Sequence, residues 1–143
     1  MKFKFSILIL LFFTITLSGC ATGPTFKEYS SNITPVKSDS GRIYVYRLTA
    51  LGAAVQPKVR LNGEIVGKAV PKGFFYVDRP AGSYEVSAST EAKRSLTLNL
   101  EPGDERYVRL EVKMGLFVGH VKPILVDKSV GEEEIATTKY AAP

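Results

Sequence analysis

The sequence predicts an all-β fold, a small β-sandwich of about seven or eight short antiparallel strands with a short helix near the C-terminus. Three observations support this. From residue 41 onward, short runs rich in β-branched and aromatic residues follow one another, turn-forming residues separate them, and several runs alternate apolar with polar side chains. The chain has 143 residues, of which 45% are hydrophobic and 23% charged, so it has room for one domain with a packed core.

The predicted strands are residues 42–48, 58–61, 64–67, 74–78, 83–90, 96–100, 108–114 and 120–127. Asn62-Gly63 joins the second to the third, because both residues tolerate the positive φ angles of a type I′ turn. The run from Glu101 to Asp104 fits a type II turn, with Pro at its second position and Gly at its third. Pro123 cannot donate a hydrogen bond to a neighbouring strand, which indicates an edge strand or the start of one.

A short helix is predicted after the last strand. Ser129 and Glu132 have the spacing of a capping box, and residues 133–139 can continue the helix. The acidic run Glu132 to Glu134 could bind a cation, but an acidic first turn that complements the helix dipole is the favoured interpretation. The predicted domain spans residues 41–139, and residues 140–143 form a tail.

Two of the predicted strands are apolar on both faces. Side chains alternate between the faces of a strand, so we expect one cluster of aromatic side chains opposite the sandwich core. Its members are Tyr44, Tyr46, Phe74 and Tyr76. The favoured interpretation is a second core covered by the C-terminal segment with Ile135 and Tyr140, since large bare apolar patches are uncommon on monomers. The alternative is an exposed binding surface for an envelope sugar or a partner protein.

The first 19 residues have the pattern of an export signal. Lys2 and Lys4 precede an apolar run over residues 5–17, which is too short for a membrane-spanning helix of about 20 residues. The run ends at Leu17-Ser18-Gly19-Cys20, which resembles the lipobox of bacterial lipoproteins. The resemblance implies that Cys20 receives a diacylglyceryl group and that a peptidase then cuts just before it. The alternative is a conventional signal with a chance cysteine.

Cys20 is the only cysteine, so it cannot form an intramolecular disulfide. Residues 20–40 are predicted to be the lipidated cysteine and a flexible tether, because residues 21–40 are rich in Ser, Thr, Pro and Gly and lack apolar periodicity. A coil of that length would reach about 25 Å. By analogy with lipoprotein sorting, Ala rather than Asp at position 21 favours the outer membrane, with the domain facing the periplasm.

Charge and composition argue against several functions. Of 19 basic residues, removal of Lys2 and Lys4 leaves 17 against 14 acidic ones, a side-chain charge of +3. The sequence lacks the long basic run of a nucleic-acid binder, so we expect no nucleic-acid partner. His120 is the only histidine, which leaves no His-based metal cluster and only a weak candidate for a catalytic triad. We therefore expect no catalytic residue, no metal and no cofactor apart from the covalent lipid on Cys20.

Several short motifs carry a family resemblance. They are residues 43–47, 59–63, 66–67, 73–75 and 80–86, together with Gly103 and residues 107–108. In this succession the chain resembles the lipoprotein domain DUF2846 over residues 41–127. The Pro-x-Gly-x-Tyr-x-Val element, which begins at Pro80, also resembles the PEGA-type extracellular module. These resemblances imply an immunoglobulin-like sandwich and an envelope location, and they imply no activity.

The expected function is that of a membrane-anchored envelope lipoprotein. Its sandwich would bind or brace an envelope protein or a cell-wall polymer without catalysis. A carbohydrate-binding module, which predicts a shallow aromatic groove, is one alternative. A cell-wall hydrolase, which predicts a pocket with two or more convergent titratable groups, is the other.

Overall fold

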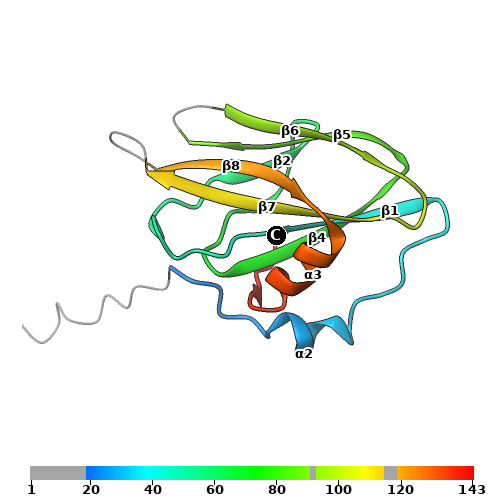
Figure 1. Ribbon diagram of the computed structural model, residues 1–143, viewed down its shortest axis with the longest axis horizontal. Coiled ribbons are helices and arrows are strands. Elements are labelled where there is room, and N and C mark those ends of the chain that lie inside the picture. Colours follow the sequence, from blue (N-terminus) through cyan, green and yellow to red (C-terminus); the bar gives the residue numbers. More distant parts are fainter. Residues whose placement is uncertain (1–18, 91–92, 115–118) are drawn as a thin grey trace, which may run out of the picture.

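The computed structural model describes residues 19–90, 93–114 and 119–143. Within these ranges nine strands form two sheets packed face to face, with two short helices beside them (Figure 1). The predicted all-β sandwich with a short C-terminal helix is thus confirmed. In chain order the elements are α2 (Phe26–Ser30), β1 (Ser40–Tyr46), β2 (Lys58–Leu61), β3 (Glu64–Lys68), β4 (Gly73–Pro80), β5 (Gly82–Ser89), β6 (Lys93–Leu100), β7 (Glu105–Met114), β8 (Gly119–Val126), α3 (Lys128–Ile135) and β9 (Lys139–Tyr140).

The strand order is β8-β7-β1-β4-β9 in one sheet and β3-β2-β5-β6 in the other. Contrary to the prediction, not every pairing is antiparallel, because β1 runs parallel to β7 and β4 runs parallel to β9. The reason lies in the connections. A tight hairpin forces antiparallel pairing, whereas the chain between β1 and β7 crosses to the other sheet and back twice, so β7 can return in the direction of β1.

The predicted turns are confirmed. Asn62 and Gly63 have φ angles of 48° and 86°, as a type I′ turn requires, and Leu61 pairs directly with Glu64. Gly103 has a φ of 81°, and the amide of Asp104 donates to the carbonyl oxygen of Glu101 at 3.0 Å. Pro123 lies on β8, an edge strand of the five-stranded sheet.

The five-stranded sheet is covered on both faces. Between the sheets lies the sandwich core, which includes Ile43, Val45 and Phe75. On the other face lies a second core, which we call the aromatic core: Tyr44, Tyr46, Phe74, Tyr107 and Ile135, with Tyr76, Phe26, Tyr29 and Tyr140 against them. As a result every residue of β1 is buried.

The segment expected to be a flexible tether is instead packed on the domain over residues 20–33, and we call it the strap. Thr25 and Glu28 form a capping box that starts α2. Phe26 meets Phe74 edge-to-face at 5.2 Å, and Tyr29 stacks on Tyr140 at 4.0 Å between ring centroids. The tether prediction was wrong because it followed composition, whereas two aromatic residues three positions apart give this short helix an apolar side.

The C-terminal helix begins earlier than predicted. Its N-cap is Asp127 rather than Ser129, and no side-chain capping bond forms. The run Glu132 to Glu134 therefore lies beyond the first turn and cannot act as an acidic first turn. The predicted tail also departs from expectation, because Tyr140 belongs to β9 and the amide of Ala141 donates to the carbonyl oxygen of Phe74 at 2.8 Å.

The hairpin turn gives a direct test of the β2–β3 connection. Gly63→Val places a β-branched residue at positive φ, where nothing else lies within 4 Å of the new Cβ, so the cost is conformational. We expect a loss of about 1 to 3 kcal/mol in the free energy of unfolding by urea. Gly63→Asn is the matched control and should lose less, because Asn tolerates this region. Equal stability of the valine variant and the wild type would contradict the turn assignment.

Candidate functional site

Cys20 lies at the boundary of the folded domain. Its side chain is exposed, and the amide of the next residue, Ala21, donates to the carbonyl oxygen of Pro71 at 2.9 Å. The Gln56 side chain donates to the carbonyl oxygen of Gly19 at 3.0 Å. Leu17 and Ser18, the first two residues of the predicted lipobox, lie outside the described residues. The candidate lipidation site is therefore next to the domain surface rather than at the end of a tether.

A buried arginine organises the loop beside Cys20. The Arg47 guanidinium donates to the carbonyl oxygens of Leu51 and Gly52 at 2.5 and 3.1 Å, and to those of Val55 and Ala69 at 2.9 and 2.8 Å. Burial lowers the pKa of Arg47, but an arginine keeps its proton in proteins. The Arg47 guanidinium thus holds the 47–57 loop in place, because its hydrogen-bond acceptors are backbone carbonyl oxygens and none of them is a carboxylate.

Arg47 could have been singled out from the sequence. It has the same parity as Ile43 and Val45, so strand alternation points its side chain inward. A charged side chain at an inward-facing position needs hydrogen-bond partners in the interior. The position of Arg47 in the strand pattern therefore predicts a buried polar site.

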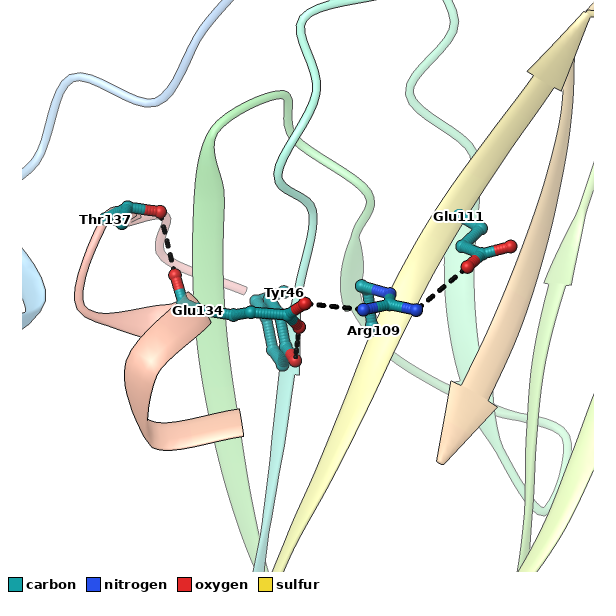
Figure 2. A network of polar contacts seen from close by, with 5 residues as sticks. All are labelled: Tyr46, Arg109, Glu111, Glu134 and Thr137. Atoms are coloured by element: carbon teal, nitrogen blue, oxygen red, sulfur yellow. Dashed lines mark hydrogen bonds and ion pairs between the residues drawn. The ribbon is translucent and has the colours of Figure 1, made fainter. Parts of the chain in front are cut away.

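A polar network joins α3 to the sheet beside the aromatic core (Figure 2). The Tyr46 hydroxyl and the Arg109 guanidinium both donate to the Glu134 carboxylate, each at 2.5 Å, and Arg109 also donates to Glu111 at 2.9 Å. The Thr137 hydroxyl caps the carbonyl oxygen of Glu134 at 2.8 Å. Burial, with a smaller effect of Glu134, raises the pKa of Tyr46, so its hydroxyl remains a donor.

This network borders a shallow hollow between β7 and the chain that follows β1. Its lining residues are Leu48, Thr49, Arg109, Leu110, Glu111, Val112 and Lys113. Both carboxylates of the network, Glu111 and Glu134, are already bound to Arg109. The arrangement suits bracing of α3 more than acid–base chemistry, which needs a titratable group free to exchange a proton.

The four aromatic residues predicted as a candidate binding surface do form one cluster, but it is internal. Tyr44, Tyr46 and Phe74 are 4%, 1% and 0% exposed, and Tyr76 is half-buried. The exposed-surface interpretation was therefore wrong, and the second-core interpretation is confirmed. The predicted C-terminal cover is present, and the strap, which the polar composition of residues 21–40 did not indicate, adds Phe26 and Tyr29 to it.

The remaining candidates are His120 and the acidic run Glu132 to Glu134, and the described residues form no site around them. His120 lies on β8 opposite Lys113, and its buried Nδ1 atom has no hydrogen-bond partner within the described ranges. In the part of the chain that the structure describes, no three His, Cys, Asp or Glu side chains are grouped closely enough to hold a metal ion. Neither described helix has the length and apolar character needed to cross a membrane.

Comparison with known proteins identifies the family. The model of a family described as "Protein of unknown function (DUF2846)" matches residues 37–121, which span β1 to the start of β8. The chain belongs to the DUF2846 family. An uncharacterized protein of Haemophilus influenzae is 30% identical over 133 residues, covering 89% of this chain and 79% of the relative. This similarity extends past the DUF2846 match into at least one of the flanking segments that cover the aromatic core. No solved structure matches.

The internal position of Tyr46 leads to a stability prediction. Tyr46→Ala removes a buried aromatic ring and should lower the free energy of unfolding by about 3 to 5 kcal/mol. Tyr46→Phe keeps the ring and removes only the bond to Glu134, so about 1 to 3 kcal/mol is expected. Urea denaturation measures both, with the exposed Thr97→Ala on β6 as a control. A Tyr46→Ala variant as stable as the control would contradict the internal core.

Proposed function

We propose that this DUF2846 protein is a lipid-anchored protein of the bacterial cell envelope, with a non-catalytic domain that binds or braces another envelope component. The observation that carries the proposal is the position of Cys20. It completes the lipobox-like run at residues 17–20, it is exposed, and the residues after it are held by the domain from Ala21 onward. Cleavage before Cys20 would cost the described fold one hydrogen bond, that between Gln56 and Gly19.

The chemistry of lipidation fits this location. An exposed thiol can be alkylated without displacing core side chains, and the resulting thioether explains a single cysteine in an exported chain. One acyl chain gives only marginal membrane binding, whereas two or more give stable anchoring. Ala21 in place of Asp supports the outer membrane as the destination, with the domain in the periplasm.

The ion pairs of the domain support a non-catalytic role. Arg109 holds Glu111 and Glu134, Arg42 holds Asp78 at 2.7 Å, and Lys128 holds Glu105 at 2.5 Å. Each of these pairs joins two different elements or two positions of one strand, so the carboxylates are used to stabilise the structure. This favours a binding domain over the hydrolase alternative.

A protein partner is favoured over a sugar. Carbohydrate recognition by stacking needs aromatic faces in contact with solvent, whereas the large hydrophobic side chains exposed in the described ranges are aliphatic: Leu51, Ile65, Met114, Leu125 and Val130. Ile65 and Leu125 lie on the edge strands β3 and β8, and unpaired strand edges are common docking positions for other chains.

Cys20→Ser tests the anchor. Cells that express the wild type should yield a mature protein that begins at Cys20 and carries the mass of its acyl groups, because the modifying enzymes need the thiol. The serine variant should incorporate no labelled fatty acid, and the conservative exposed variant Thr22→Ser should behave as the wild type. Mass spectrometry of the purified proteins measures this. A wild-type protein without acyl mass, or one cut elsewhere, would contradict the proposal.

Photocrosslinking in intact cells tests the binding role. A photoreactive residue at Ile65 or Leu125 should give a discrete crosslinked protein adduct, while the same residue at Asn99, a polar exposed position of β6, should not. Absence of adducts at both hydrophobic positions would rule against a protein partner at these edges.

A further inference from the structure

The strap places the predicted lipid at one end of the sandwich. The amide of Ala21 donates a hydrogen bond to the carbonyl oxygen of Pro71, in the connection between β3 and β4. A Cβ added to Gly19 would lie 3.0 Å from the Cβ of Ala53, in the loop between β1 and β2. The start of the strap, this loop and the end of β7 lie together at the left of Figure 1. We call this the anchor end of the domain.

The strap has little freedom to move the lipid away. A Cβ on Gly23 would overlap the carbonyl oxygen of Tyr140, so the backbones touch there. Thr25 bridges to Lys139, and the amide of Tyr140 donates to the carbonyl oxygen of Pro24 at 2.8 Å. A lipid on Cys20 therefore brings the anchor end, rather than a 20-residue tether, to the bilayer.

Among the described residues, the anchor end is basic. Exposed cationic side chains occur where strands start or finish there: Lys58, Lys68, Lys72, Lys93, Arg94 and Lys113. Lys93 pairs with Glu85 at 2.8 Å. For the others, no ion pair with a described carboxylate is present. Glu111, which lies toward this end on β7, is already bound to Arg109.

The opposite end is richer in acidic residues. The turns and strand ends there carry Asp39, Glu64, Glu101, Asp104, Glu105 and Asp127. Some of these are paired, as Asp104 is with Arg106 at 2.7 Å. An anionic surface attracts the basic end and repels the acidic one, so the two ends orient the domain in the same sense.

Two exposed aliphatic side chains add an apolar component. Leu51 is 49% exposed and Met114 is 68% exposed. They belong to adjoining segments, because a Cβ on Gly52 would lie 3.7 Å from Val112 on β7. Apolar side chains among cationic ones are typical of surfaces that rest in the headgroup region of a bilayer.

We propose that the anchor end is a docking surface for anionic phospholipid, which holds the domain directly on the bilayer in one orientation. The proposal rests on lipid anchoring at Cys20. The occupant is the bilayer that carries the anchor, because the basic and apolar residues surround the anchored residue itself.

The test uses the lipidated full chain in vesicles of phosphatidylcholine, with or without phosphatidylglycerol. Lipidation consumes the native thiol, so a single fluorophore can be attached at Ser89→Cys on the anchor end or at Asn99→Cys on the opposite end of the neighbouring strand. Headgroup-linked quencher should reduce fluorescence several-fold more at position 89 than at position 99. The difference should be larger with phosphatidylglycerol, because the attraction is electrostatic.

Charge reversal supplies the matched control. Lys68→Glu with Lys72→Glu should remove the dependence on phosphatidylglycerol. Lys37→Glu with Lys128→Glu is an equal charge change at the opposite end, where Lys37 precedes β1 and Lys128 pairs with Glu105 at the start of β7, and it should leave the dependence intact. Equal quenching at the two positions, or no effect of Lys68→Glu with Lys72→Glu, overturns the docking surface while the protein still floats with the vesicles. Failure of the wild type to float overturns lipid anchoring and the docking surface together.

Discussion

Strand β1, in the middle of the five-stranded sheet, is buried along its whole length, and the rest of the structure follows from that constraint. A strand apolar on both faces needs a cover on each side, because several large side chains would otherwise face water. The four-stranded sheet supplies one cover, over Ile43 and Val45. The other must come from segments outside the sandwich, and it is built from the two ends of the chain around Tyr44 and Tyr46.

The two ends of the chain support each other as well as the sheet. Tyr29 of the strap stacks on Tyr140 of β9. The Glu134 carboxylate of α3 accepts hydrogen bonds from the Tyr46 hydroxyl and the Arg109 guanidinium. Since Cys20 is the first residue of the strap, the proposed lipid anchor is directly connected to the segment that covers the aromatic core. Any force on the anchor would be transmitted to β4 and β9 rather than absorbed by a loose linker.

Local patterns were sufficient to predict much of this fold. Period-two alternation placed Tyr44, Tyr46, Phe74 and Tyr76 on one face, and Asn62-Gly63 predicted its hairpin, since both signals act between near neighbours. Parallel pairing of β1 with β7 could not be inferred, because it depends on how a long connection returns. The strap was not predicted, because residues around Phe26 and Tyr29 are mostly polar and indicate a coil. The spacing of Thr25 and Glu28 does fit a capping box and could have indicated the helix. The partners of Glu134 lie far away in sequence, so no local pattern could identify them.

Native-state hydrogen exchange can establish whether residues 20–33 are part of the folded domain. The amides of Ala21, Phe26 and Tyr140 donate to backbone carbonyl oxygens at 2.9, 3.1 and 2.8 Å, and each bond exists only while the strap is docked. We expect slow exchange at all three amides, with free energies of opening close to those of the β1 amides. Exchange of Ala21 and Phe26 at the rate of an unstructured peptide, while β1 stays protected, would show that the strap is a free tether.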